Sequence, residues 1–416
     1  MKNNQKVYII GAGVSGLIAA INLEKEGLSP TIIEADNAVG GRVQNDIVND
    51  YILDRGFQVL LTSYPAAQKY LDYKKLDLSY FLPGAVIFKN KTQKVIGDPT
   101  RSLQLLIPTL FSGIGTIKDK FKILQLNRLL KKKSIDDIFK TKEQTTLSYL
   151  EDFGFSENII HDFFQPFFSG IFLETKLNTS SRMFEFVYKM FGEGLAAIPK
   201  KGIGEITKQL HQQLKNTTIL FNTKVKEVSH QKITLENGDV LSGDYIIVTA
   251  NHSDLIPNLK SQKTAWKSCY NLYFELNHKN INKPLIGLVP DKNSIINNIV
   301  FSSSLQTNPN NNHIISVTVV DNQNLSEEEL IIKVSTELDL FCNIKISKFL
   351  KMYFIPKSLP DINHLQYESN PSETQLTQSI FLAGDLQLNG SLNAAMLSGE
   401  KAALGVLEAA EKTIIN

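Results

Sequence analysis

The chain has 416 residues, of which 42% are hydrophobic and 21% charged, with a net charge of +2. A single hydrophobic core stops growing at about 250–300 residues, so we expect two domains. The near-neutral charge argues against a nucleic-acid-binding surface, and we expect no nucleic-acid partner. No run of eighteen apolar residues exists, which excludes a predicted membrane-spanning helix.

Cysteine and histidine usage excludes further classes. Cys269 and Cys342 are the only cysteines and have no CxxC or metal-binding spacing, and the seven histidines are scattered singly. We therefore expect no metal site. So few cysteines suit a reducing cytoplasm, and residues 1–6 lead into the first strand without the apolar core of a secretion signal. A cytoplasmic location is the expectation.

The first predicted element is a buried parallel strand, residues 7–10, followed directly by the glycine turn GAGVSG. In this turn Gly11 permits a tight bend, Gly13 lets the backbone approach a pyrophosphate, and Gly16 lets the next helix pack against the strand. The spacing indicates a phosphate-binding turn.

A helix and a second strand complete this unit. The helix begins at Val14 and Ser15, where its N–H groups and positive dipole end face the phosphates. The second strand, residues 30–33, is followed by Glu34 and Ala35, where a βαβ unit places the acid that binds ribose hydroxyls. A carboxylate repels a 2′-phosphate, which disfavours NADP. Strand, turn, helix and acid together predict a dinucleotide-binding fold.

A second glycine turn separates FAD from NAD. Gly40, Gly41 and Arg42 follow the second strand, and an NAD-binding domain has no use for this pair of glycines with an arginine. A guanidinium pairs with pyrophosphate or approaches a flavin. The chain has only five arginines among 44 basic residues, so we do not expect Arg42 to be generic surface charge.

The C-terminal residues supply a matching motif. Residues 379–383 predict a central strand that ends in Gly384 and Asp385, and a long helix starts after Gly390 and runs to about residue 411. The two motifs lie at opposite ends of the sequence. Their combination is far more specific than a lone glycine turn.

With these motifs the sequence resembles the FAD-dependent amine oxidase and phytoene desaturase superfamily, which also contains protoporphyrinogen oxidases. Segments 155–157, 165–170 and 179–184 look most like the desaturase and protoporphyrinogen-oxidase branches. The resemblance implies FAD as cofactor. We expect it to be noncovalent because no histidyl- or cysteinyl-flavin motif is present. It also implies flavin neighbours at Gly56, Phe57 and Gln58, adenine at Val225, ribityl or phosphate at Asp385, and flavin at the helix start Ser391, Leu392, Asn393 and Ala394.

The predicted fold class is α/β, with a discontinuous Rossmann-like FAD-binding domain and a second α+β substrate domain made of an antiparallel sheet plus helices. We assign residues 1–85, 196–255 and 375–416 to the FAD-binding domain. The substrate-binding domain takes 86–195 and 256–374.

Other local patterns give more detailed expectations. Residues 64–79 predict a helix, Asn237-Gly238 predicts a type I′ hairpin turn, and Ser326 predicts a helix N-cap. Alternation predicts strands that include residues 299–303 and 349–355, and the Asn-rich segment 308–312 is expected to be a loop.

Residues 100–195 have a helical and unusually apolar pattern with many phenylalanines. Aromatic side chains at helical spacing fit either a hydrophobic substrate tunnel beside a flavin or an ordinary core.

Within this region, residues 103–133 combine an apolar run with a lysine-rich stretch. Composition favours a buried helix followed by a solvated basic helix, and a peripheral contact with a membrane is the second interpretation.

Three functions remain open. The first is an FAD-dependent oxidase or desaturase that removes a hydride from a C–H bond of a small hydrophobic substrate, isoprenoid-like or tetrapyrrole-like, with oxygen, a quinone or another acceptor. The second is a soluble flavin amine oxidase. Lys267 is the nearest candidate for its lysine at the flavin, but it lies a few residues before the expected place. The third is a flavin-binding protein or a non-redox flavin isomerase.

Overall fold

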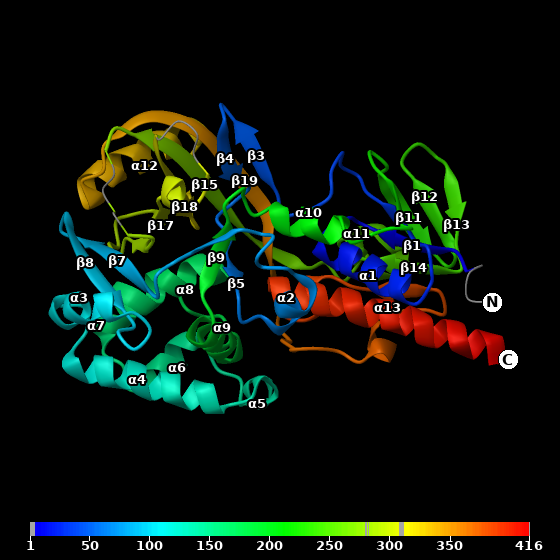
Figure 1. Cartoon of the computed structure of the whole chain (residues 1–416), viewed down its shortest axis with the longest axis horizontal. Helices are drawn as coiled ribbons and strands as arrows, with labels where there is room; N and C mark the ends of the chain where they lie inside the picture. The colour runs from blue at the N-terminus through cyan, green and yellow to red at the C-terminus, as the bar shows by residue number, and fades with distance from the viewer. Residues whose placement is uncertain (1–4, 279–280, 282, 308–311, 416) are drawn as a thin grey trace.

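The structure is a computed structural model that describes residues 5–278, 281, 283–307 and 312–415, and Figure 1 shows its elements. The first four residues of the polar N-terminal segment, and residues 308–311 of the predicted Asn-rich loop, lie outside the described residues. The predicted α/β class is confirmed, because parallel and antiparallel sheets are both present together with many helices.

A five-stranded parallel sheet forms one side of the molecule, shown on the right of Figure 1. Its strands come from four distant stretches of the chain, in the order β10 (Thr218–Leu220), β2 (Thr31–Ile33), β1 (Val7–Ile10), β14 (Tyr245–Val248) and β20 (Ile380–Leu382). All four residues of β1 are buried, as its apolar sequence predicts.

Alternate residues of β1 serve two cores, because successive side chains of a strand point to opposite faces. Val7 and Ile9 pack with the helices α1 (Val14–Lys25) and α13 (Leu392–Ile415). Tyr8 and Ile10 pack with a small antiparallel sheet made of β11 (Val225–Ser229), β12 (Lys232–Leu235) and β13 (Val240–Ser242). The parallel sheet is therefore covered on both faces.

A seven-stranded sheet forms the other side of the molecule, in the order β19 (Ile346–Asp361), β15 (Ala265–Leu276), β18 (His313–Val319), β17 (Ile296–Val300), β16 (Ile286–Leu288), β7 (Gly84–Lys89) and β8 (Thr92–Gly97). Every neighbouring pair is antiparallel except β16 and β7. Helix α12 (Glu327–Cys342) shares a core with this sheet and begins with the predicted cap, a capping box between Ser326 and Glu329.

The predicted helical region is confirmed between residues 103 and 193. It comprises η2 (Leu103–Leu105), α3 (Leu106–Phe111), α4 (Ile117–Lys132), α5 (Ile135–Lys140), α6 (Thr146–Asp152), α7 (Glu157–Ile159), the π-helical turn η3 (Ile160–Phe164), α8 (Gln165–Phe172) and α9 (Ser181–Glu193).

Shorter elements join the two sides. They are the hairpin β3 (Asn45–Val48) and β4 (Tyr51–Asp54), the sheet β5 (Leu60–Leu61), β9 (Ala196–Pro199) and β6 (Leu78–Tyr80), the helices α2 (Pro65–Tyr70), α10 (Glu205–His211) and α11 (His252–Leu255), and the turns η4 (Pro257–Leu259), η5 (Ser302–Ser304), η6 (Pro371–Thr374) and η7 (Asp385–Gln387).

Two local predictions were wrong, because the side chains of Asp72 and Asn237 accept hydrogen bonds from nearby backbone N–H groups. The helix predicted over 64–79 ends at Tyr70, since the Asp72 carboxylate accepts the N–H groups of Lys74 and Lys75 and turns the chain. The Asn237-Gly238 turn is not type I′, because Gly238 has a positive φ of 94° but Asn237 does not. The Asn237 side chain accepts the N–H of Asp239 instead.

Two predicted strands have different limits. The strand predicted over 299–303 runs from Ile296 to Val300, and a 3₁₀ turn follows. The strand predicted to end at residue 355 continues to Asp361 through two prolines. Because β19 is the edge strand of its sheet, a proline there leaves no central hydrogen bond unmade.

Asp54 links β4 to β15 and to two loops. It is buried at the end of β4, its carboxylate accepts the Ile203 N–H at 2.8 Å and the Gln306 amide at 2.7 Å, and its carbonyl accepts the Tyr273 hydroxyl. Burial raises the pKa of this carboxyl to about 7, against the smaller effect of the two hydrogen bonds.

Since the folded-state pKa of Asp54 is raised, the protein should lose stability as pH rises from about 4 to about 7, where the folded state holds a proton that the unfolded state has lost. The loss is at most about 4 kcal/mol from this group. Urea unfolding of the wild type and of Asp54→Asn across this range should show a pH-dependent difference. Parallel pH profiles for the two proteins would contradict the assignment.

Candidate functional site

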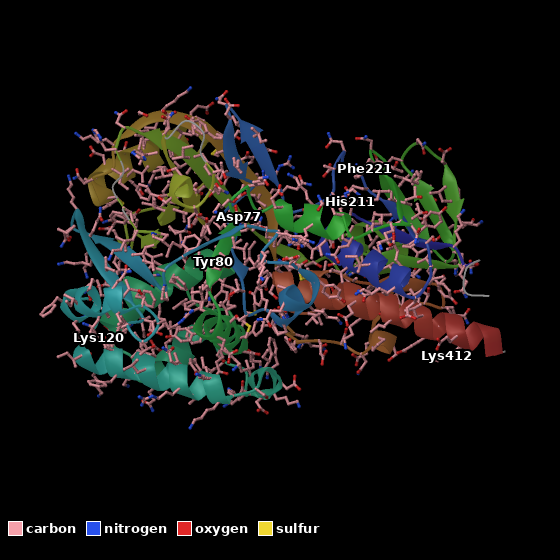
Figure 2. The ribbon with its side chains drawn as sticks, in the orientation of Figure 1. Asp77, Tyr80, Lys120, His211, Phe221 and Lys412 are labelled. Carbon is pink, nitrogen blue, oxygen red and sulfur yellow. The ribbon has the colours of Figure 1, made fainter. Side chains whose placement is uncertain are left out.

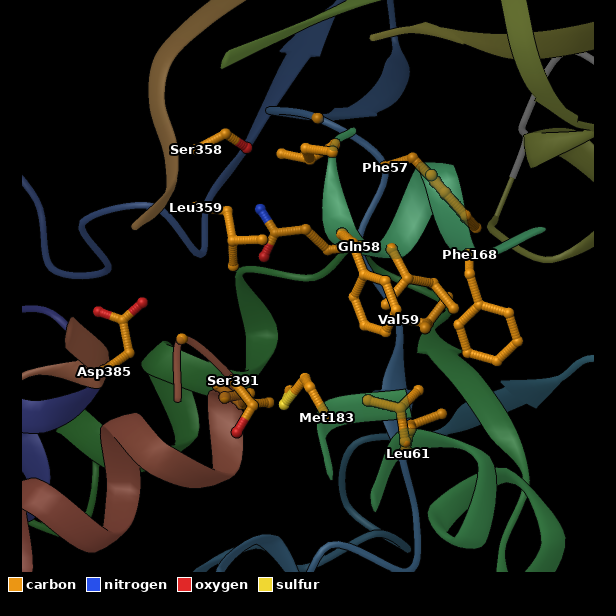
Figure 3. A pocket seen from close by; sticks show the side chains of 18 of the residues that line it. Phe57, Gln58, Val59, Leu61, Phe168, Met183, Ser358, Leu359, Asp385 and Ser391 are labelled. Carbon is orange, nitrogen blue, oxygen red and sulfur yellow. The ribbon is translucent and has the colours of Figure 1, made fainter. Parts of the chain in front are cut away.

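A cavity of about 2100 Å³ lies between the two sides of the molecule. Figure 3 shows Asp385 and Ser391 on one side of it, and Phe57, Val59 and Phe168 on the other. A pocket for one small ligand has roughly 300–1,000 Å³. The cavity therefore has room for a long cofactor together with a substrate.

The structure brings most of the predicted site residues to this cavity. Those that line it are Gly11, Gly13, Val14, Ser15, Glu34, Ala35, Gly40, Gly41, Arg42, Gly56, Phe57, Gln58, Val225, Gly384, Asp385, Ser391 and Leu392.

The predicted residues Gly16, Asn393 and Ala394 do not line the cavity and lie behind it. A Cβ on Gly16 would meet the Gly11 carbonyl oxygen at 2.0 Å, so this glycine allows the helix to approach the turn. Asn393 is buried and accepts the Ala66 N–H at 3.0 Å, and the Ala394 N–H donates to the Ser391 hydroxyl. They support the site without facing it.

The β1–α1 turn forms an open cradle. Gly11 adopts a φ of +106°, and a Cβ on Gly13 would have no neighbour within 4 Å. Gly13 is the N-cap of α1 and provides no side-chain hydrogen bond, so the first N–H groups of the helix remain available to an anion. This geometry fits a pyrophosphate.

The second glycine turn lies directly beside the first. The Gly40 N–H donates to the Ala12 carbonyl at 2.9 Å, and a Cβ on Gly41 would lie 3.5 Å from the Gly13 Cα. Arg42 follows at once and so reaches the cavity next to the cradle.

Glu34 is fixed at the end of β2. Its two carboxylate oxygens accept the N–H groups of Ala12 at 2.6 Å and Asp36 at 2.9 Å, and the side chain is buried. An ionised carboxylate has about four lone-pair positions, which leaves capacity for ribose hydroxyls. Val225 lies nearby at a β-bulge in β11, where the pairing with β12 shifts.

Arg42 and Asp385 pair with each other. The Arg42 Nη1 lies 3.0 Å from Asp385 Oδ2, Nη2 binds the other carboxylate oxygen, and Nη1 also donates to the Ser358 carbonyl. The guanidinium lies 5.3 Å from the Trp266 ring centroid. Sequence reasoning placed each residue on FAD separately, and those roles stay a prediction.

The segment predicted to pass the flavin ring lies at the centre of the cavity. Gly56 has a φ of +91°, and the Gln58 side chain donates to the Arg42 carbonyl at 2.8 Å. Phe57 packs edge-on against Phe81 with ring centroids 6.2 Å apart. The segment is thus tied to the arginine turn on one side and to an aromatic surface on the other.

Aromatic residues of α8, α9 and η3 serve both as lining and as core. Phe163, Phe167 and Phe168 face the cavity, and Phe168 packs on the fully buried Phe184 with centroids 4.7 Å apart. These aromatic residues therefore belong both to the hydrophobic core and to the lining of the cavity, and their contact with a substrate stays a prediction.

Lys267 also lines the cavity, from β15. Its ammonium group lies 3.6 Å from Asp361 and 3.5 Å from the Thr179 hydroxyl. Its proximity to a flavin stays a prediction.

Sequence reasoning missed Trp266 and the last residues of β19. Trp266 pairs with Pro360 and Lys267 with Leu359, so the end of β19 forms a wall of the cavity beside Arg42. The strand predicted over residues 349–355 stops short of this wall. The position of β19 at a sheet edge was the missing information.

The described residues also bear on membrane spanning and on metal binding. No helix among them is both long and apolar enough to cross a bilayer. No cluster of three or more His, Cys, Asp or Glu side chains among them has an arrangement suited to a metal ion.

The family model described as "Flavin containing amine oxidoreductase" matches residues 14–407. The chain belongs to this family. Its cofactor is therefore FAD, which fits the open cradle at Gly13 and the uncapped start of α1, and the protein is an FAD-dependent oxidoreductase.

Similar proteins include coproporphyrinogen III oxidase of Bacillus subtilis (strain 168), 26% identical over 292 residues, which cover 59% of this chain and 60% of the relative. Protoporphyrinogen oxidase 2 of Arabidopsis thaliana is 28% identical over 172 residues, which cover 40% of this chain and 32% of the relative. The matched segments thus span less than two thirds of either relative.

Among solved structures, a putative protoporphyrinogen oxidase from Exiguobacterium sp. 255-15 has a TM-score of 0.73 at 16% identity. The alignment covers 98% of this chain and 99% of the other, which shows that the fold is shared.

Gly13→Ala should weaken FAD binding without destabilising the fold. The new methyl group has free space and an ordinary φ in the protein alone, but it would occupy the approach to the pyrophosphate. Loss of one charge-assisted hydrogen bond predicts a roughly tenfold rise in Kd. Titration of the deflavinated protein with FAD and its thermal melt measure the two effects. A lowered melting temperature with unchanged FAD affinity would contradict the assignment.

Proposed function

We propose that this protein removes a hydride from a C–H bond of a hydrophobic, tetrapyrrole-like substrate, as a porphyrinogen oxidase does. The observation that carries the proposal is the aromatic lining of the cavity, which continues from Phe57 through Phe168 to Phe191 beyond the predicted cofactor contacts. A large apolar ring system gains free energy from burial against such a lining.

Two relatives support the tetrapyrrole over an isoprenoid, because their names are those of porphyrinogen oxidases. A positively charged side chain at the cavity also supports a tetrapyrrole substrate. Porphyrinogens carry carboxylate side chains, which require cations, whereas an isoprenoid hydrocarbon does not.

Lys176 is the cation that fits this role. It is exposed at the cavity, and within the described part of the chain it has no ion-pair partner. Lys267 is close to Asp361, Lys357 binds Asp254, and Arg101 donates to main-chain carbonyls, so these cations are already engaged.

The chemistry needs few groups from the protein. Bound FAD supplies the two-electron acceptor. The aromatic walls hold the substrate and exclude water, Gln58 and Gly56 keep the central segment in place, and the Arg42 turn fixes the cofactor end of the cavity. We expect FAD to be held noncovalently.

Amine oxidation is the second candidate, favoured by the position of Lys267 on the cavity wall. Against it, the Lys267 ammonium lies close to Asp361 and Thr179. We therefore rank it below the porphyrinogen.

Anaerobic mixing of the enzyme with its substrate should bleach the flavin absorbance. We expect bleaching with coproporphyrinogen or protoporphyrinogen and none with aliphatic amines, because the aromatic lining suits a large ring system and Lys176 suits its carboxylates. Bleaching by amines alone would overturn the proposal, and product formation without any reduced acceptor would indicate an isomerase. Mixing the reduced enzyme with oxygen and with a quinone identifies the acceptor.

The variant Lys176→Gln tests whether this lysine binds the substrate carboxylates. Loss of an exposed charge contact predicts a KM for the porphyrinogen about fivefold higher with kcat unchanged, as expected when substrate and transition state lose the same contact. Lys140→Gln, at an exposed lysine that does not line the cavity, is the matched control. An equal change of KM in both variants would show that Lys176 does not bind the substrate specifically.

A further inference from the structure

Large apolar side chains are exposed at one end of the molecule. Eight of the fifteen exposed large hydrophobic residues in the described chain lie between positions 103 and 129. Leu103 is 83% exposed, Ile107 69%, Phe111 80% and Phe121 68%. The buried helix favoured by composition is therefore wrong for residues 103–111, since most side chains of η2 and α3 point outward.

A defined backbone turn between α3 and α4 accompanies this exposure. Gly113 and Gly115 have positive φ angles and turn the chain between α3 and α4, while Ile114 between them is buried. The Thr116 hydroxyl and the Asp119 carboxylate form a capping box at the start of α4. The exposure is thus built into an ordered turn.

Helix α4 has one outward face that changes character along its length. Ile117, Phe121, Arg128 and Lys132 are exposed and fall within one stripe at a rotation of 100° per residue, whereas Leu126 and Leu130 on the opposite face are buried. The first turns of this face are apolar and the last turns are basic.

The basic side chains of this region are open to a partner. Lys118, Arg128, Lys131 and Lys132 are exposed, and in the ranges that the structure describes none of them forms an ion pair. Figure 2 labels Lys120, which belongs to the same helix, at the end of the molecule away from Lys412.

Several of these exposed apolar residues also line the cavity. Leu106, Leu110, Phe111, Ile117 and Phe121 line it, together with the aromatic residues described above. The apolar lining therefore continues from the interior onto the exposed surface, and a few polar side chains, among them Arg101 and Lys120, line the cavity with it.

We propose that η2, α3 and the outward face of α4, here called the α3–α4 surface, bind the face of an anionic phospholipid membrane, and that the substrate enters the cavity from the lipid. The entry step rests on the proposed function, because only a hydrophobic substrate partitions into lipid. The membrane contact itself does not.

Charge favours a membrane over a protein partner. An apolar surface that enters the headgroup layer, flanked by unpaired lysines and an arginine, complements anionic lipids along its whole length. A second copy of the chain would offer these cations no anionic partner in a symmetric contact, because the only acidic side chain of α3 and α4, Asp119, is buried.

Sedimentation with phospholipid vesicles tests the contact. The FAD-loaded protein should sediment with vesicles of phosphatidylcholine and phosphatidylglycerol, less with phosphatidylcholine alone, and be released by salt. Leu103→Ser with Ile107→Ser should lower the vesicle partition coefficient at least tenfold. Lys131→Glu with Lys132→Glu should lower it about tenfold or more for the anionic vesicles only.

Matched control variants distinguish binding by this surface from nonspecific adsorption to vesicles. Ile47→Ser with Ile332→Ser removes two exposed hydrophobic residues elsewhere, and Lys345→Glu with Lys348→Glu reverses two exposed lysines elsewhere. Both should keep the wild-type partition. An equal loss in the controls, or no sedimentation of the wild type, would overturn the proposal.

A dimer in solution that Leu103→Ser with Ile107→Ser dissociates, without vesicle binding, would show that the surface joins two copies. Flavin bleaching by detergent-dispersed porphyrinogen, measured on the wild type, reports on the proposed function separately. A protein that binds vesicles but is not bleached keeps the membrane contact and loses only the entry step.

Discussion

The close packing of α1 against α13 is the constraint on which the site depends. A Cβ on Gly399 of α13 would meet the Ser15 carbonyl oxygen of α1 at 2.2 Å, so only glycine permits this backbone contact. Both helices start at the carboxyl edge of the parallel sheet, after β1 and β20. Their N-termini therefore reach the same cavity, although about 380 residues separate them in sequence.

This arrangement explains how the two glycine turns and the C-terminal motif act together. The Gly40 turn bonds to the β1–α1 turn and carries Arg42 to Asp385, which precedes α13. The cofactor end of the cavity is thus enclosed by polar groups and helix N-termini, while the remainder has aromatic walls that reach the α3–α4 surface. A polar region for the cofactor beside an aromatic region is the arrangement that the proposed function requires.

Much of the site could be predicted because its signals are local. The glycines at 11, 13 and 40, and the acid at 34, are required by turns and hydrogen bonds that span few residues. The Arg42–Asp385 pair and the wall formed by Trp266 and Pro360 could not be predicted, since they depend on how distant segments meet. Exposure of Ile107 and Phe111 was only the second interpretation of the sequence, because an apolar run is compatible with a core and with a surface.

The central claim is that the N-terminal βαβ unit holds the adenosine half of FAD, with Glu34 and the Val225 backbone as its contacts. Titration of the deflavinated protein with FAD and with FMN, which lacks that half, tests it most directly. The account predicts tight binding of FAD and at least a hundredfold weaker binding of FMN, a difference of about 2.7 kcal/mol or more. Equal affinities for the two flavins would contradict it.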